Sequence, residues 1–443
     1  MRTILGLVIL FSLFSSSLFA QEKTTLNWIG HWKSEYGREN LVWEVKKEFE
    51  FINGDVTLNL KFPDEIMGFR SKKETAEYYA KMIKSGNFAW DIIWLDDQSY
   101  RMVAEELNDF QWGKKYLVDF EKEVPGFKER HKSFIIDSPE FRNHTGGTLI
   151  GPYVEGCYYI LWYNKSLADK MGITIKEEGM LFDDLLSYFE KVSRYNEDHG
   201  TAIAAIYGSS DFIPVEYLFQ NLFKSEIGDL ASVKEEKLTE KKKKAYLKTL
   251  QAIEELGKHR GLIESYSENI WFDTRELPLD DKCLFYVAGS YMYSHWMGLD
   301  QEKTQKMYPA ELPVFREIDF YLGTYIPTWG VLKDSPHKKE AVDFLMYWAE
   351  PKIAEKWVWY TKTPTGLKGD LTSIDLADDR YERFNSLIAK KYGKNIHHTS
   401  SGGYVLGREN QLLKTEMDKK FLEVLAGKIT AQAAYDAIMG KVK

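Results

Sequence analysis

The sequence TLNWIGHW at residues 25–32 starts the pattern that decides the fold. Its apolar residues Leu26 and Trp28 alternate with polar neighbours, which predicts a β-strand that ends in a loop at residues 30–32. Apolar residues then recur every fourth position across residues 41–49, which predicts a helix. The sequence VTLNLKF at residues 56–62 predicts a second strand. This strand–helix–strand order predicts an α/β fold with a largely parallel sheet covered on both faces.

The same alternation continues along the chain. Further strands are predicted at residues 90–95, 158–163 and 201–207, and a helix with an apolar face at residues 182–192. Ser335 before a proline predicts the cap of a later helix, and Thr430 predicts the cap of the last one. The pattern restarts after residue 153, so we expect two α/β units joined by short crossings.

The N-terminus has the order of a secretory signal peptide. Met1-Arg2-Thr3 is followed by an uncharged, mainly apolar segment at residues 4–20, and we predict cleavage near Ala20 and a periplasmic location. A membrane anchor is the alternative, but the apolar segment is short and charged residues follow it at once. A lipid anchor would require a cysteine at the start of the mature chain, whereas the two cysteines are Cys157 and Cys283.

Size and charge narrow the function further. A chain of 443 residues is too long for one ordinary core and suits two lobes of comparable size. The formal net charge is −8, with basic residues interspersed among acidic ones, so we expect no nucleic acid partner. The two cysteines either pair or lie buried as free thiols, because both stand in apolar, strand-like segments.

Motifs for catalysis are missing from the sequence. There is no Gly-x-Ser-x-Gly turn, no phosphate-binding P-loop and no His-Glu-x-x-His helix. The pair His397-His398 is adjacent in an extended segment, where neighbouring side chains diverge, so it does not predict a metal site. Asp96 and Asp97 are also adjacent and do not define the facing carboxylates of a glycosidase. We therefore expect no enzyme, no metal and no cofactor.

Aromatic residues stand at several chain reversals, and these are candidates for ligand binding. Loops at the carboxyl ends of strands converge on the crevice of an open α/β sheet, and an aromatic face matches the apolar face of a sugar ring. Carboxylates such as Asp96 and Glu155 can accept hydrogen bonds from hydroxyl groups. Core packing is the alternative for each aromatic residue, and surface charge or helix capping is the alternative for the carboxylates. The aromatic candidates are Trp32, Tyr153, Tyr291, Trp329 and Tyr404.

A series of short motifs resembles one family along essentially the whole mature chain. It comprises WIG at residues 28–30, DIIW at 91–94, YNKSL at 163–167, VAGSY at 287–291, WGVL at 329–332, AVDFL at 341–345 and TPTG at 363–366. In this order the motifs resemble the extracellular solute-binding proteins of family 1, the group of maltose-binding protein. Trp90, where the family commonly has proline, and the insertion at residues 66–70 depart from the pattern.

The resemblance implies a periplasmic-binding-protein fold, in which two α/β lobes close on a ligand about a hinge and then dock on the membrane permease subunits of an ABC importer. It implies crossings near residues 152–156, 313 and 364, and we expect a monomer. The predicted N-terminal lobe comprises residues 21–152 and 314–364, and the C-terminal lobe residues 153–313 and 365–443. The resemblance also implies that the cleft is faced by the loops at Trp32 and at Asp96-Asp97 and by Tyr153, Tyr291, Trp329 and Tyr404.

Three functions remain open from the sequence. The first is a receptor for a mono- or oligosaccharide. The second is a receptor for a charged small molecule on the same fold; Asp96, Asp97 and Trp329 would suit a polyamine, and Arg70 is the candidate for binding a phosphorylated polyol. The third is a secreted carbohydrate-active enzyme, for which the sequence offers no facing carboxylate pair.

Overall fold

The computed structural model describes residues 23–68, 71–138, 141–142, 145–210, 215–262, 264–369, 379–392, 395–398 and 403–442. The predicted signal peptide lies outside these residues. Within these ranges, no helix combines the length and the hydropathy that a bilayer crossing requires.

The first sheet has the strand order β2-β1-β3-β9. Its strands are β1 (Thr24–Ile29), β2 (Val56–Lys61), β3 (Ile92–Trp94) and β9 (Trp329–Val331). The strands β1, β2 and β3 are parallel, as predicted, and β9 runs antiparallel to β3. The helices of this half are α1 (Gly37–Ile52), α2 (Pro63–Met67), α3 (Lys72–Ser85), α4 (Asp97–Leu107), α5 (Trp112–Tyr116), α6 (Phe120–Glu123), α7 (Ser133–Ile136), α17 (Lys338–Trp348) and α18 (Pro351–Thr361).

The second sheet has the order β10-β8-β4-β6-β5, with β7 also paired to β4. Its strands are β4 (Glu155–Asn164), β5 (Ala204–Ile206), β6 (Cys283–Gly289), β7 (Met307–Ala310), β8 (Tyr321–Ile326) and β10 (Ile396–His398). Here the prediction of a largely parallel sheet is wrong, because the long central strand β4 runs antiparallel to β6, β7 and β8. Alternation of strands and helices along the sequence does not determine the direction in which a strand enters the sheet.

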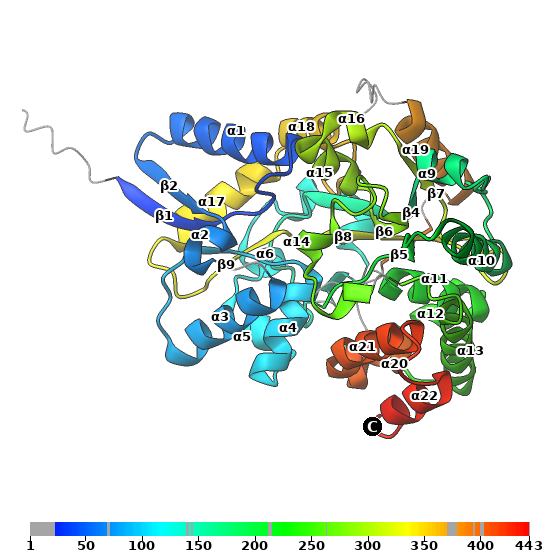
Figure 1. The fold of residues 1–443 in the computed structure, drawn as a ribbon. Coiled ribbons are helices and arrows are strands. Elements are labelled where there is room, and N and C mark those ends of the chain that lie inside the picture. Colours follow the sequence, from blue (N-terminus) through cyan, green and yellow to red (C-terminus); the bar gives the residue numbers. More distant parts are fainter. Residues whose placement is uncertain are drawn as a thin grey trace, which may run out of the picture.

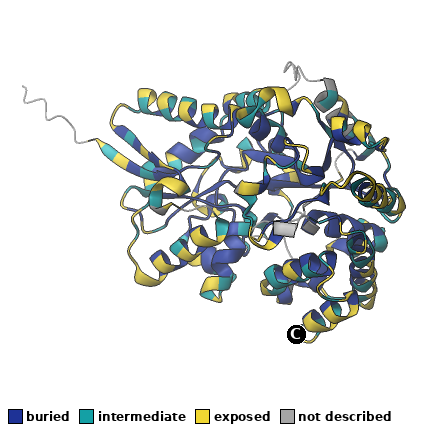
Figure 2. Cartoon of the chain, in the orientation of Figure 1, coloured by how far each residue is buried: buried dark blue, intermediate teal, exposed yellow. Residues whose placement is uncertain are grey.

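Helices surround the second sheet and form the other half of the molecule in Figure 1. They are α9 (Lys165–Lys170), α10 (Phe182–His199), α11 (Val215–Ile227), α12 (Leu230–Lys234), α13 (Glu240–Gly257), α14 (Trp271–Thr274), α15 (Met292–Leu299), α16 (Gln301–Thr304), α19 (Asp379–Tyr392), α20 (Gly403–Leu406), α21 (Lys414–Leu425) and α22 (Ala431–Met439). The burial pattern in Figure 2 follows this arrangement, since the central strands are buried and the outer helices expose one face.

The buried apolar side chains form one core around each sheet. The first core draws on residues 26–154 and 325–367, and the second on residues 157–322 and 384–438 in two adjoining clusters. The chain therefore changes core near residue 155, between residues 322 and 325, and after residue 367. Two of these passages lie side by side, because the amide of Gly156 donates to the carbonyl of Pro364 at 2.9 Å. The lobe boundaries given above stay predictions, including the one at residue 313.

Local details follow from the sequence in part. Thr430 caps α22, as predicted, since its side chain accepts a hydrogen bond from the amide of Ala433. The predicted cap at Ser335 is wrong by two residues, because His337 is the N-cap of α17. The hydroxyl of Ser335 instead donates to Asp91 at 2.5 Å and ties this turn to the first sheet. Both cysteines, Cys157 and Cys283, are free and buried.

Candidate functional site

A cavity of about 520 Å³ lies between the two halves of the molecule. The first half contributes the loop at residues 31–35, the start of α3, the end of β3 and the start of α4. The second half contributes the start of β4, residues of α11 and α14, Tyr291 and the end of β8. The site therefore lies beyond the carboxyl ends of β1 and β3, where an open α/β sheet places its ligand crevice.

Two carboxylates meet the cavity where β3 passes into α4. Asp96 is the N-cap of α4 and accepts a 2.7 Å hydrogen bond from the amide of Ser99. Lys72 forms an ion pair with Asp96 and, against the effect of burial, helps to lower its pKa. Burial and the neighbouring charge of Asp96 raise the pKa of Asp97 to about 7. At neutral pH Asp97 is thus present in both forms and can donate as well as accept a hydrogen bond.

Part of the wall contributed by the first half is aromatic. The rings of His31 and Trp94 are stacked, with centroids 4.2 Å apart and planes inclined by 16°. Burial lowers the pKa of His31 to about 3, so this imidazole is neutral at physiological pH. Phe62 adds a further ring to the same wall.

The opposite wall is also aromatic. Tyr159 and Tyr217 stack at a centroid distance of 3.7 Å, and Tyr291 and Trp271 line the cavity beside them. The guanidinium of Arg275 lies 5.5 Å from the ring of Trp271. Rings from both halves of the molecule therefore face the cavity.

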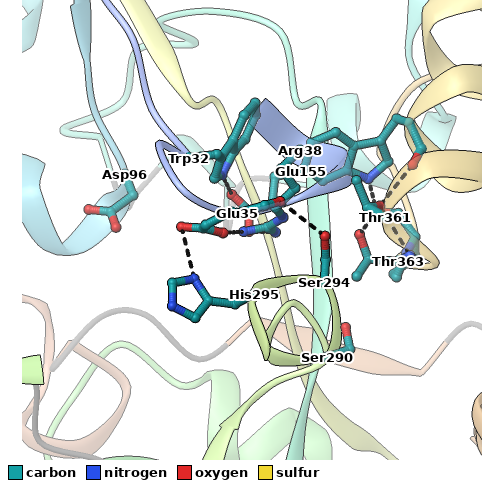
Figure 3. A network of polar contacts seen from close by, with 12 residues as sticks. Trp32, Glu35, Arg38, Asp96, Glu155, Ser290, Ser294, His295, Thr361 and Thr363 are labelled. Carbon is teal, nitrogen blue, oxygen red and sulfur yellow. Dashed lines mark hydrogen bonds and ion pairs between the residues drawn. The ribbon is translucent and has the colours of Figure 1, made fainter. Parts of the chain in front are cut away.

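A buried arginine joins the halves on one side of the cavity (Figure 3). Arg38 of α1 is 2% exposed, donates to Glu35 at 2.9 Å and forms an ion pair with Glu155 at the start of β4. The indole of Trp32 also donates to Glu155, at 3.3 Å. Although burial lowers the pKa of Arg38, the carboxylates of Glu155 and Glu35 raise it above its usual value. Three rings enclose the guanidinium at 5.2–5.4 Å, those of Trp32, Tyr291 and Trp357.

The same network reaches α15 in the second half. The backbone oxygen of Glu35 accepts a 3.2 Å hydrogen bond from Ser294, and its carboxylate lies 3.7 Å from Nδ1 of His295. Burial would raise the pKa of Glu35, but Arg38 and His295 hold it well below its usual range. We call this group, Glu35, Arg38, Glu155 and His295, the hinge network.

A second charged group joins the halves at the far end of the cavity. Lys414 of α21 lies 2.5 Å from Glu216 of α11 and also forms an ion pair with Asp418. Burial lowers the pKa of Arg101 on α4, but Glu216 and Asp418 raise it above its usual value. Burial and the charge of Glu216 raise the pKa of Asp418 to about 7. We call Arg101, Glu216, Lys414 and Asp418 the mouth network.

The structure brings five of the candidate residues to the cavity: Trp32, Asp96, Asp97, Glu155 and Tyr291. Trp329 lies in the first core instead, fully buried, with its ring centroid 4.8 Å from that of Trp348 and 5.2 Å from that of Trp32. Tyr153 is 1% exposed and packs against Phe141 in the same core. Tyr404 belongs to α20, but its side chain lies outside the described residues.

Several cavity residues had no functional assignment from the sequence. Trp94 is the last residue of the motif DIIW at residues 91–94. Its place at the end of a predicted strand could have identified it as a cavity residue. Arg38, Lys72, Arg101 and Glu216 stand in helices, where charged residues are typical of a solvated face, and only the packing of the folded chain makes them part of a site. Among the residues that the structure describes, no group of three or more His, Cys, Asp or Glu could hold a metal ion.

Comparisons with known proteins add the family context. A stretch of 114 residues, 26% of this chain, is 28% identical to the melibiose/raffinose/stachyose-binding protein MelE of Bacillus subtilis (strain 168), and it spans about a quarter of that relative. Among solved structures, maltose-bound MalE3 of T. maritima superposes with a TM-score of 0.66 at 15% identity, covering 95% of this chain and 99% of that one. A chitin oligosaccharide binding protein superposes with a TM-score of 0.69 at 14% identity, covering 94% and 97%.

These superpositions show the periplasmic-binding-protein fold that was predicted. Residues 69–380, most of the chain, match the bacterial extracellular solute-binding proteins. The match includes the end of β3, the start of α4, all of β4 and Tyr291, which carry much of the cavity wall. This chain therefore belongs to the family of bacterial extracellular solute-binding proteins.

Proposed function

We propose that this protein is an exported receptor that binds a neutral carbohydrate in the cavity and delivers it to the permease subunits of an ABC importer. The observation that carries the proposal is the combination, in one cavity, of paired charges and aromatic rings from both lobes. Charged side chains around the cavity neutralise one another, whereas rings from both lobes line the space itself.

The pairing of charges disfavours a charged ligand. Lys72 pairs with Asp96, and Lys33 lies 2.8 Å from Asp64. Glu35 and Glu155 share Arg38, and Glu216 pairs with Lys414. A polyamine or a phosphorylated polyol would have to separate such pairs, and breaking a buried pair leaves an uncompensated charge. A neutral ligand can bind while these ion pairs stay intact.

The remaining groups suit a sugar. Aromatic rings such as Tyr291, Trp271 and Trp94 match the apolar face of a pyranose, and stacking contributes about 0.5–1.5 kcal/mol beyond the burial of area. The carboxyl of Asp97 and the neutral ring of His31 can exchange hydrogen bonds with hydroxyl groups. Relatives named for melibiose, raffinose, stachyose and maltose support the same ligand class.

The family and the N-terminal sequence support export, and we propose cleavage near Ala20. The likeness to the ABC substrate-binding protein Lmo0181 from Listeria monocytogenes supports delivery to an importer. We propose that the cavity binds the sugar without converting it.

A thermal-shift screen of the chain from Gln21 onward tests the ligand class, with neutral sugars, spermidine and glucose 6-phosphate as probes. A ligand that binds only the folded state at 100 times its Kd stabilises the protein by about 2.7 kcal/mol. We expect stabilisation by one or more neutral sugars and recovery of the sugar unchanged by chromatography. Stabilisation by spermidine or by the sugar phosphate alone would contradict the proposal, and a cleaved sugar would show an enzyme.

A further inference from the structure

We propose that the ligand is a linear oligosaccharide whose distal units leave the cavity and occupy a second cavity between α3–α4 and α11–α21. This inference rests on the proposed carbohydrate function and specifies the size of the sugar. It assigns a binding role to a part of the cleft that lies beyond the aromatic walls.

The second cavity has a volume of about 550 Å³ and adjoins the first. Four residues line both cavities: Ser71, Gln98, Arg101 and Glu216. They lie at the boundary between the two spaces, and each of them has polar side-chain atoms there. The first cavity alone already has a volume typical of a small-molecule site. The second therefore roughly doubles the space available to one ligand.

The chemistry of the second cavity differs from that of the first. Among its 14 described lining residues only Ala76, Met102 and Ile270 are apolar, and none is aromatic. Ring stacking is therefore confined to the first cavity, and the second offers hydroxyl, amide and charged groups. Such a wall suits the hydroxyl-rich end of an oligosaccharide and would bind an apolar ligand poorly.

Both lobes contribute to the second cavity. Lys73 on α3 and Glu105 on α4 belong to the first half, whereas Thr415 and Lys419 on α21 belong to the second. The hydroxyl of Thr415 already donates to Glu105 across the gap at 2.8 Å. A ligand that fills both cavities touches both lobes at two places, so each added unit favours the closed state through contacts that the open state lacks.

Calorimetric titration with two sugar series tests the inference. The series are melibiose, raffinose and stachyose, and maltose, maltotriose and maltotetraose, in which each member has one more sugar unit than the one before. In the parent protein we expect affinity to rise by about tenfold or more from the shortest to the longest member of the series that binds.

Two variants locate this gain. In Thr415→Trp the indole obstructs the second cavity, and in the double variant Lys73→Ala/Lys419→Ala two donors are removed from its opposite walls without disturbing either core. Both should lower the affinity for the longest sugar by about tenfold. The difference in affinity between the longest and the shortest sugar should therefore become smaller. The matched control is Lys81→Ala/Lys420→Ala, whose side chains lie on the same two helices outside the cavity lining. It should retain the full gain with length.

The possible outcomes separate the two proposals. If sugars bind with an affinity that does not depend on their length, the second cavity does not hold the distal units, and the proposed carbohydrate function still stands. A gain with length that both variants retain would place the distal units elsewhere and also overturn it. Stabilisation by spermidine or glucose 6-phosphate, with no titration by any sugar, would overturn the carbohydrate function and this inference with it.

Discussion

The hinge network and the mouth network both contain a buried arginine of the first half that faces carboxylates of the second half, but they differ in surroundings. Arg38 is enclosed by three aromatic rings beside the chain passages, and its carboxylate partners have no competing lysine in the network. Arg101 lies at the boundary of two cavities, near Glu216 and Asp418, which Lys414 also neutralises. We infer that the first network belongs to the folded framework, whereas the second forms fully only when the lobes close.

The largest expected effect is on folding, at the hinge network. Arg38→Ala leaves Glu35 and Glu155 buried without their cation, and it should lower the free energy of unfolding by about 3–5 kcal/mol. Urea denaturation measures this. The control Lys33→Ala breaks exposed ion pairs and should cost at most about 1 kcal/mol. Equal losses of unfolding free energy in the two variants would contradict the assignment of the hinge network to the folded framework.

A core tryptophan and a cavity tryptophan sharpen the comparison. Trp329→Ala removes a fully buried ring from the first core and should cost about 3–5 kcal/mol of stability. Trp271→Ala removes a half-buried cavity ring that also packs against the second core. It should cost less stability than Trp329→Ala while lowering sugar affinity about tenfold, or 1.4 kcal/mol. Denaturation and calorimetric titration of both variants test this. Loss of affinity in a folded Trp329→Ala, with Trp271→Ala unaffected, would reverse the two roles.

The mouth network should affect closure more than folding. Arg101→Gln keeps a polar side chain but removes the charge that faces Glu216 and Asp418. We expect sugar affinity to fall about tenfold, and the radius of gyration at saturating sugar to stay unchanged from the parent's closed value. Small-angle scattering with titration measures both quantities. A loss of stability as large as that of Arg38→Ala would show that this network, too, belongs to the framework.

The smallest expected effect is a dependence of affinity on pH. Burial raises the pKa of Asp97 and of Asp418 to about 7, and opening the cleft should return both toward the ordinary value for Asp, about 3.9, as water reaches them. Between these values the closed state binds more protons than the open state. Sugar affinity should therefore fall several-fold as the pH rises from about 4 to about 7, and it should stay nearly constant at higher pH.

Calorimetry in two buffers with different ionisation enthalpies measures the proton uptake directly. Asp418→Asn removes one titrating group and should reduce the uptake, while the charges facing it from Arg101, Glu216 and Lys414 remain. Proton release on binding, or an uptake that the substitution leaves unchanged, would contradict the prediction. The same sign applies to stability, because the folded state with raised pKa values loses stability as the pH rises from about 4 to about 7.

The parts of this protein that local patterns determine were predictable. Alternation and spacing placed β1, β2, α1 and the loop that carries Trp32, and the strand predicted at residues 90–95 placed Asp96 and Asp97 at its end. Trp329 shows the limit of such reasoning. It stands near a chain reversal, but β9 pairs antiparallel with β3, and this pairing places its ring among Trp28, Trp32 and Trp348. Arg38 and Arg101 could not be assigned, because the carboxylates that each of them faces in the other half are more than 100 positions away.

The two free cysteines make the protein suitable for conversion into an optical sensor. Thiol-selective dyes react with the thiolate, and burial raises the pKa of both Cys157 and Cys283 well above the usual value. Neither native thiol should therefore take up a dye while the protein is folded. A cysteine introduced at the exposed position of Lys419, on the rim of the cleft, would be labelled alone, and its fluorescence would report the approach of α21 to α4 as sugar binds.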